Sequence, residues 1–399
     1  MMRRIAVITG TRADYGLLYW LIHDLALAQD IALQLVVTGM HLMPEFGHTM
    51  DVIERDGFPV AATVDLQLTT DTPESVARSM GVGMIGFAEA FARLQPDLVV
   101  ILGDRFEMLA AASAAFVQQV PIAHIHGGEL TEGALDEGFR HAITKLAALH
   151  FTAAEPYRRR VIQMGEQPER VFNVGAPGLD HIRRTTLLSA DALEQALDFC
   201  LGRQNFLVTF HPATLDTEGA ASQCRQLLAA LDAFPEARIV ITLPNNDPGG
   251  WAMIPLLEAY AARHSDRCRL YASLGQLRYL SLMRQVQVVI GNSSSGIIEA
   301  PSFGAATVNV GDRQRGRLRA ISVIDCAPEC TEIEKAIECA LAYSFQARLA
   351  RVENPYGAGD AAGRMVQILR GANLPDLRRK PFYDLPFFDY PMSNTHESI

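Results

Sequence analysis

The stretch AHIHGGELTEGALDE, residues 123–137, carries two histidines and four carboxylates within fifteen residues. His124 and His126 alternate along a predicted strand, so their side chains share one face. A zinc site would need a third ligand and an open position, and Glu129 is the available group. The Gly127–Gly128 turn bends the chain away from the histidines, so we favour acid–base chemistry over a metal site. A purely structural role for both histidines is the third interpretation.

The carboxylates after this turn strengthen the acid–base interpretation. Glu129, Asp136 and Glu137 are expected to share one crevice, where the charge on one carboxylate raises the pKa of its neighbour. An enzyme that removes one proton and delivers another needs two groups with separated pKa values. The sequence therefore predicts His126, Glu129 and Asp136 as catalytic residues.

Two further catalytic candidates directly follow apolar runs. Asp104 comes after DLVVILG, where a carboxylate is costly unless it is hydrogen-bonded, so it is a candidate base. An ion pair with Arg105 is the structural alternative. His211 comes after NFLVTF, where an imidazole can cancel negative charge or move a proton near neutral pH. A structural histidine is the alternative there.

The segment GNSSSGIIEAPSFG, residues 291–304, is the best phosphate-binding candidate. An apolar run ends at Ile290, and small hydroxyl residues then open a helix whose free backbone N–H groups suit a diphosphate. Glu299 lies one turn further on, where a carboxylate can accept hydrogen bonds from both hydroxyls of a ribose. A plain serine N-cap is the alternative, and the sequence has no Walker motif.

Arginines near two other strand ends add positive charge. Arg12, in TGTRADYG, stands at a strand–helix turn that suits a bidentate phosphate contact, and Asp14 either caps the helix or orients Arg12. Arg313 and Arg315, in GDRQRGR, are the matching groups of the second half, with an exposed surface position as the alternative. The candidate ligand-binding residues are Arg12, Asp14, Ser293, Ser294, Gly296, Glu299 and Arg313.

Short apolar runs that alternate with amphipathic stretches must position these side chains. Runs that are apolar on both faces and separated by helices predict parallel sheets covered on both sides. The runs lie at 4–10, 32–39, 97–103, 121–127, 150–154 and 171–175, and at 205–212, 237–245, 268–274, 286–293 and 306–311. Because ligands bind beyond the carboxyl ends of such strands, we expect an α/β protein with two Rossmann-like domains facing across a cleft. The predicted domains are residues 1–178 and 179–365, and a cross-over helix and tail follow at 366–399.

Composition narrows the possible partners. The chain has 399 residues, too many for one typical core, and its net charge of −10 argues against a broad nucleic-acid-binding face. Its six cysteines form no C-x-x-C pair, which is typical of free thiols in a reducing compartment. No apolar run approaches the ~20 residues that span a bilayer, and the amino terminus lacks a full signal sequence. We expect a cytoplasmic protein with no membrane partner.

Taken together, these motifs resemble those of the hydrolysing UDP-N-acetylglucosamine 2-epimerases, in one order and as far as about Leu369. The motifs are TGTRADYG, GDR, HIHGGELTEGALDE, RHAITK, HP, GNSSSGIIE and GDRQRGR. Some family members supply N-acetylmannosamine for bacterial sialic acid, and close siblings act on a UDP- or GDP-linked diacetylbacillosamine for legionaminic acid. The resemblance implies the glycosyltransferase-B fold and a UDP-linked N-acetylhexosamine in the cleft. It also implies no metal or other cofactor, and a homo-oligomer that is a dimer or a tetramer.

The resemblance also implies roles for individual residues. Those that would hold the UDP are Arg12, Ser293, Ser294, Glu299 and Arg313, and those that would line the reacting sugar are Asp104, His126, Glu129, Asp136 and His211. The animal and non-hydrolysing enzymes carry glutamate where this chain has His126, so Glu129 or Asp136 could take part of the proton transfer. The implied reaction is elimination of UDP to a glycal, followed by addition of water with a proton returned to the opposite face of C2. A glycosyltransferase of the same fold and a non-catalytic nucleotide-sugar sensor are the competing hypotheses.

Overall fold

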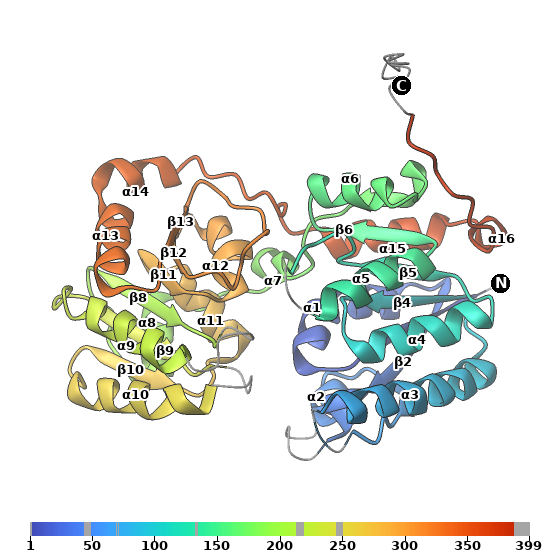
Figure 1. Cartoon of the computed structure of the whole chain (residues 1–399), viewed down its shortest axis with the longest axis horizontal. Coiled ribbons are helices and arrows are strands. Elements are labelled where there is room, and N and C mark those ends of the chain that lie inside the picture. Colours follow the sequence, from blue (N-terminus) through green and yellow to red (C-terminus); the bar gives the residue numbers. More distant parts are fainter. Residues whose placement is uncertain are drawn as a thin grey trace, which may run out of the picture.

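The computed structural model describes residues 2–43, 49–68, 70, 72–131, 135–212, 219–244 and 250–386. The chain forms two parallel β-sheets, one from each half of the sequence, and helices pack against both (Figure 1). This arrangement confirms the predicted fold class of two Rossmann-like α/β halves. The predicted tail beyond residue 386 lies outside the described residues.

The first sheet has seven strands within the described ranges, in the order β3-β2-β1-β4-β5-β6-β7. The strands are β1 (Arg3–Thr9), β2 (Ile31–Thr38), β3 (Val60–Val64), β4 (Leu98–Leu102), β5 (Ile122–Ile125), β6 (Leu149–Thr152) and β7 (Val171–Asn173). The helices are α1 (Arg12–Leu27), α2 (Met50–Arg55), α3 (Pro73–Leu94), α4 (Phe106–Val117), α5 (Leu135–Leu146) and α6 (Glu155–Gln163), with 3-10 turns η1 (Gly39–Leu42) and η3 (Pro168–Arg170). The strand order reverses between β1 and β4, and ligands of such sheets bind at this switch point.

The second sheet repeats this plan, with the described strands in the order β10-β9-β8-β11-β12-β13. They are β8 (Asn205–Thr209), β9 (Arg238–Thr242), β10 (Cys268–Tyr271), β11 (Val288–Gly291), β12 (Ala306–Val310) and β13 (Val323–Cys326). The helices are α7 (Leu179–Arg184), α8 (Ala190–Leu197), α9 (Ala220–Leu231), α10 (Gly250–Arg263), α11 (Gly275–Met283), α12 (Ser294–Ile298), α13 (Cys330–Leu341) and α14 (Tyr343–Leu349), with η4 (Ala300–Phe303). Its switch point lies between β8 and β11.

The central strands are buried on both faces, as their unbroken apolar sequence predicts. Val7 and Val100 pack in the core on one side of the first sheet, whereas Ala6 and Ile101 pack in the core on the other side. Successive strand residues point to opposite faces, so each strand contributes to both cores. The polar residues that follow these strands are therefore left at one edge of the sheet.

The helices that cover the sheets are short or amphipathic. In α3, the hydroxyl of Thr72 accepts a hydrogen bond from the backbone N–H of Ser75, and Pro73 occupies the first turn. Phe87 and Phe91 of this helix are buried, whereas Ile85 is exposed. Across the described ranges, no helix is both long and apolar enough to cross a bilayer.

The end of the chain returns to the first half through α15 (Ala361–Gly371), which α16 (Leu374–Leu377) follows (Figure 1). Met365 and Leu369 of α15 join the core that α1 covers. The carboxylate of Asp180 accepts hydrogen bonds from the backbone N–H groups of Ala361 and Ala362, at 2.8 and 2.7 Å. The helix therefore begins against α7 and then packs along α1 of the first half. The domain boundaries themselves stay a prediction.

Candidate active site

A cavity of about 220 Å³ lies between the two halves, where residues beyond the strand ends of both sheets meet. Its first-half residues come from α1, from α5 and from the loops around β4, β5 and β7, and its second-half residues come from α12 and the loop after β12. The lining residues are Asp14, Leu17, Leu102, Gly103, Asp104, Arg105, His126, Glu129, Arg140, Ala176, Gly178, Ser294, Ile298, Glu299 and Arg317. Six of the predicted site residues thus share one cavity.

Asp104 forms an ion pair with Arg140 of α5 at the cavity wall. Arg140 is almost completely buried, and it also donates hydrogen bonds to the backbone oxygen of Glu129 and the hydroxyl of Thr131, both at 2.9 Å. One guanidinium therefore ties the loop after β4 to the loop after β5. The alternative partner predicted for Asp104, Arg105, instead donates to the buried carboxylate of Glu107 at 2.5 Å.

His126 and Glu129 form a second pair, in which Nδ1 of the imidazole contacts the Glu129 carboxylate. His126 has a left-handed backbone, with φ of 67°, which is uncommon outside glycine and costs free energy that other contacts must offset. Burial alone would raise the pKa of Glu129, but His126, Arg317 and Arg140 outweigh it and lower that pKa to about 2. Nε2 of His126 is buried without a partner among the described residues, and His126 lines the cavity.

His124 does not share this role, although it alternates with His126 along β5. It is fully buried, with Nε2 2.8 Å from the backbone oxygen of Gly103 and Nδ1 3.1 Å from the hydroxyl of Thr144. Burial lowers the pKa of His124 to about 3, so the neutral ring donates to Gly103 and supports the Asp104 loop. Among the described residues, no group of three or more His, Cys, Asp or Glu side chains is placed to hold a metal ion.

Asp14 lies in the first turn of α1, where the charge of the buried carboxylate of Glu107 acts on it. The hydroxyl of Thr11, the N-cap, accepts from the backbone N–H of Asp14 at 3.1 Å, so the cap is Thr11 and not Asp14. Burial, and then the negative charge of Glu107, raise the pKa of Asp14 to about 6 against the opposing effect of Arg105. Oδ2 of Asp14 has no partner among the described residues.

We expect Asp14→Asn to stabilise the protein at pH 7.5 and to have little effect at pH 3.5. The pKa of Asp14 is about 6 in the folded state, above the reference value of 3.8. Between pH 3.8 and pH 6 the folded state therefore binds more protons than the unfolded state, and the free energy of unfolding falls as the pH rises through this range. A difference of about two pKa units corresponds to an upper limit of about 3 kcal/mol. Urea unfolding at both pH values measures the effect.

The exposed mid-helix carboxylate of Glu258 provides the control for this prediction. Glu258→Gln should leave the free energy of unfolding almost unchanged at both pH values, because an exposed group gains little from losing its charge. An Asp14→Asn protein with the same stability difference at pH 3.5 and 7.5 would contradict the raised pKa.

The second half contributes the turn after β11. The hydroxyl of Ser293 caps α12 by accepting from the N–H of Ser295 at 3.4 Å. Glu299 lines the cavity, and its Oε2 atom is buried without a partner among the described residues. Burial raises the pKa of Glu299, while hydrogen bonding from Ser295 and the charge of Arg317 oppose that rise. Oε1 of Glu299 lies 3.2 Å from the point where a Cβ on Gly178 would stand, so the two halves approach closely here.

Six predicted residues lie outside the set that lines this cavity. Gly296 is buried in packing, because a Cβ there would stand 2.7 Å from Cγ2 of Thr307 on β12. Arg12 is exposed on the first turn of α1, and Asp136 lies in the first turn of α5. Partial desolvation, and then the charge of Asp104, raise the pKa of Asp136. The other three are Ser293, His211 and Arg313.

His211 and Arg313 gather around Asn292 instead. The side chain of Asn292 accepts from the N–H of His211 at 2.7 Å and donates to its carbonyl at 2.8 Å. Arg313 donates to the backbone oxygen of Asn292 at 3.2 Å. Burial, and then the charge of Arg313, lower the pKa of His211 to about 4. The ring is therefore neutral at pH 7.

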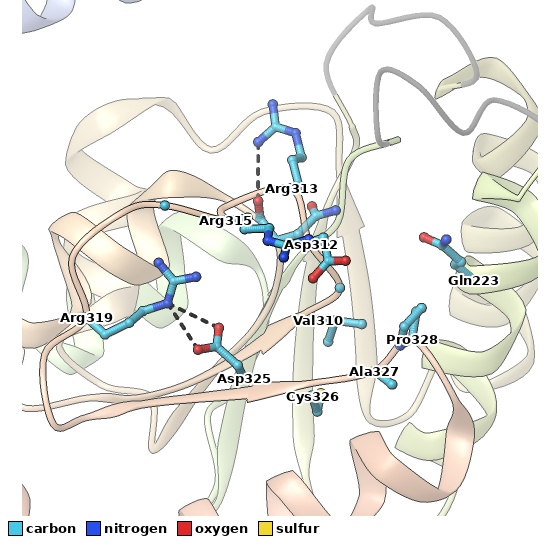
Figure 2. Close-up of a pocket in the computed structure, with 13 residues that line it drawn as sticks. Gln223, Val310, Asp312, Arg313, Arg315, Arg319, Asp325, Cys326, Ala327 and Pro328 are labelled. Carbon is cyan, nitrogen blue, oxygen red and sulfur yellow. Dashed lines mark hydrogen bonds and ion pairs between the residues drawn. The ribbon is translucent and has the colours of Figure 1, made fainter. Parts of the chain in front are cut away.

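A second hollow of about 680 Å³ opens beside Asn292, at the carboxyl ends of β12 and β13. Figure 2 shows Arg313 and Arg315 on one side of it and Cys326 and Pro328 on the other. Arg319 forms an ion pair with Asp325 at 3.2 Å along its rim (Figure 2). In the described structure, the two arginines predicted from GDRQRGR face this hollow, whereas Arg317 of the same turn lines the central cavity.

The sequence interpretation missed several residues of the cavity. Arg317 and Arg140 both stand inside quoted motifs, GDRQRGR and RHAITK, so a signal was present in each case. Their spacing gave no reason to prefer them over neighbouring basic residues. Glu107 does not line the cavity, but it is fully buried with its Oε2 atom unpartnered within the described residues, and only the structure reveals that its charge acts on Asp14.

Known proteins with similar sequences match this chain over most of its length. A family model described as UDP-N-acetylglucosamine 2-epimerase matches residues 23–370. The GDP/UDP-N,N'-diacetylbacillosamine 2-epimerase (hydrolyzing) of Campylobacter jejuni is 38% identical over 384 residues, which cover 96% of this chain and 99% of the relative. The polysialic acid biosynthesis protein P7 of Escherichia coli is 36% identical over 386 residues, which cover 96% and 98%.

Among solved structures, the UDP-GlcNAc 2-epimerase from Neisseria meningitidis bound to UDP-GlcNAc superimposes with a TM-score of 0.79. It is 22% identical, and the match covers 92% of this chain and 100% of that one. This likeness supports the two-sheet fold already described. The family model and the two relatives each span most of the chain, so the protein belongs to the UDP-N-acetylglucosamine 2-epimerase family.

Proposed function

We propose that this protein is a hydrolysing 2-epimerase that converts UDP-N-acetylglucosamine to N-acetylmannosamine and UDP. The observation that supports the proposal is one cavity with two chemically different sides. Ser294, Glu299 and Arg317 come from the second half, and Asp104 and the His126–Glu129 pair come from the first. Hydroxyl and cationic groups suit a departing diphosphate, while ionisable groups suit proton transfer at the adjacent sugar carbon.

The first step in this proposal is elimination. The C1–O bond breaks toward the diphosphate, the C2–H bond gives its proton to Asp104, and a C1–C2 double bond forms, which leaves a glycal and UDP. The C2 hydrogen becomes acidic only as positive charge builds on the ring. Arg317 and Ser294 stabilise the charge on the leaving diphosphate. Arg140, paired with Asp104, holds this carboxylate at the cavity wall.

The second step adds water across the double bond. The oxygen of water bonds to C1, and His126 gives a proton to C2 on the face opposite to the one that lost it. The proton released by water returns to His126, and Asp104 releases the proton it took from C2 to solvent, which leaves the epimerised free sugar and the starting form of the protein. The His126–Glu129 pair suits this role, because the contact between Nδ1 and the Glu129 carboxylate orients the imidazole ring in the cavity. Nε2 of His126, which has no partner among the described residues, can deliver the proton.

The substituents of the sugar define a second candidate substrate. The Campylobacter relative is described as acting on diacetylbacillosamine linked to GDP or UDP, so UDP-N,N'-diacetylbacillosamine is the alternative, followed by its GDP form. Both sugars carry a 2-acetamido group, and they differ at C4 and C6, so the same residues would perform the same two steps. A role in sialic acid-type sugar biosynthesis, a cytoplasmic location and a homo-oligomeric state stay predictions.

Incubation with each of these three nucleotide sugars in D2O tests the proposal. We expect equal amounts of free nucleoside diphosphate and free C2-epimerised sugar, with deuterium at C2, measured by proton NMR. A glycosyltransferase would release the nucleotide only when an acceptor is present, and a sensor would bind the nucleotide sugar unchanged. Epimerised product that retains the original hydrogen at C2 would rule out elimination.

A further inference from the structure

Two buried tyrosines join the halves next to the loop that carries Arg317 into the cavity. Tyr157 belongs to α6 of the first half, and Tyr356 belongs to the segment that leads from the second half back to α15. Both are almost fully buried, in an apolar cluster to which Ile297 of α12 also belongs. Their hydroxyl groups lie 3.1 Å apart. Neither hydroxyl takes part in the chemistry proposed above.

Both hydroxyls also contact the backbone of Leu318, the residue after Arg317. The N–H of Leu318 donates to the Tyr157 hydroxyl, and the Tyr356 hydroxyl donates to the carbonyl of Leu318, both at 3.3 Å. A carbonyl only accepts, so the single O–H of Tyr356 is used in the hydrogen bond to Leu318. Tyr157 must therefore be the donor in the hydrogen bond between the two hydroxyls. The three residues therefore form one closed ring of hydrogen bonds with a single direction.

The same turn of α6 also supports the loop that carries Glu129. Arg160 donates to the backbone oxygen of Gly128. Gly128 has a φ of 79°, and a Cβ there would stand 2.5 Å from the carbonyl oxygen of Tyr157, so only glycine allows this close approach. One segment of α6 thus contacts the backbone next to Glu129, at Gly128, and the backbone next to Arg317, at Leu318.

We propose that the Tyr157–Tyr356 pair is a positioning device that holds Arg317 in the cavity next to Glu129 whenever the two halves are in contact. The ring needs a donor or acceptor from each half, so it forms only when the halves meet. This inference rests on the proposed function for its effect on turnover, but the geometry of the ring does not depend on that function.

The placement of Arg317 has an electrostatic consequence at Glu129. Among the described residues, the charges that act on this carboxylate come from His126, Arg140 and Arg317, and the phenol of Tyr356 also interacts with it. Removing one cation from this set raises the pKa of a buried carboxylate. A change in the ring is therefore expected to appear as a change in the titration of Glu129.

Tyr157→Phe is the principal test, because it removes one hydroxyl and leaves the N–H of Leu318 without a partner. We expect kcat to fall by about tenfold, which corresponds to a modest loss of transition-state stabilisation, with a smaller change in the Kd for UDP. We also expect the acid limb of the kcat profile to move to higher pH. Tyr356→Phe should have the same effects, and the double variant should be no worse than either single one, because the ring acts as a unit.

A second measurement does not depend on turnover. In protein with 13C-labelled glutamate carboxyl groups, the resonance that Glu129→Gln removes should keep its ionised position down to pH 4 in the wild type, and should begin to titrate above pH 4 in Tyr157→Phe. Tyr260→Phe is the matched control, because its buried hydroxyl contacts Asp232 and Arg267 away from the cavity. It should alter stability but neither kcat nor this resonance.

The outcomes separate the two proposals. Variants that lose stability but keep the wild-type kcat, pH profile and Glu129 titration would overturn the positioning role and leave the proposed function intact. A wild-type protein that releases no sugar from any nucleotide sugar would overturn the proposed function, and the NMR titration would still decide the positioning role. If Tyr157→Phe does not fold, Tyr356→Phe carries the same two measurements.

Discussion

Replacing Asp104 by asparagine is expected to lower kcat by about 10²–10⁴-fold while UDP still binds with nearly its wild-type affinity. Asparagine keeps the shape of the side chain and can still accept from Arg140, but it cannot take a proton from carbon, and general-base catalysis contributes on this scale. Asp104 and the turn after β11 line the same cavity from opposite halves. Steady-state kinetics with the preferred nucleotide sugar gives kcat, and calorimetric titration gives the Kd for UDP.

Asp97→Asn is the matched control for this experiment. Asp97 stands at the opposite end of β4 and also pairs with an arginine, Arg4, at 3.3 Å, so its loss reports what an aspartate–arginine pair on this strand does for stability alone. We expect its kcat to stay near the wild-type value. A near-normal kcat for Asp104→Asn would remove Asp104 from the mechanism, and a large loss of UDP affinity would assign it a binding role instead.

Arg317→Met should reduce kcat/KM by about 10²–10³-fold, a loss typical of removing one preorganised group that stabilises negative charge in a transition state. Arg317 lines the cavity with Ser294 and Glu299, and its charge affects both Glu129 and Glu299. Methionine keeps most of the aliphatic length of the side chain and removes the cation, so the packing of the loop should change little. Kinetics over a range of substrate concentrations separates the loss in kcat from the change in KM.

Arg319→Met provides the comparison for Arg317, because Arg319 lies two residues further along the same loop. Its guanidinium pairs with Asp325 at the rim of the second hollow (Figure 2) and donates to the backbone oxygen of Arg317 at 2.7 Å. The variant therefore removes contacts that support the loop but keeps the Arg317 cation, and we expect its kcat/KM to remain within a few-fold of the wild-type value. Equal losses in the two variants would attribute the effect to the loop as a whole, and this result would argue against a specific contact between Arg317 and the diphosphate.

The strand-end rule explains why so much of the site could be predicted. Asp104 follows β4, His126 ends the run that contains β5, and Ser294 and Glu299 follow β11. When parallel strands are buried on both faces, polar side chains are found mainly at the strand ends. The two sheets were recognisable from the same pattern, and the shared cavity joins residues that are nearly two hundred positions apart in the chain.

The partners of these residues could not be predicted, because they depend on how a turn or helix is oriented after it leaves the sheet. GDRQRGR offers three arginines, and the structure directs Arg313 and Arg315 toward the second hollow and Arg317 into the cavity. Similarly, His124 and His126 look equivalent in the sequence. The left-handed backbone at His126 turns its side chain to Glu129, while His124 stays buried beneath Gly103.

The sequence alone determined the two parallel sheets, the edge at which each places its polar residues and the identity of the groups able to carry the chemistry, because hydrophobic periodicity and residue type are local properties. Only the tertiary structure decided which of these groups interact: Asp104 pairs with Arg140, His126 pairs with Glu129, the charge of Glu107 acts on Asp14, and the two tyrosines contact Leu318. Apart from His126 and Glu129, which share the loop after β5, these groups come from different elements and, for the tyrosines, from different halves. Burial and charge act on a group through such neighbours, which no local pattern in the sequence specifies.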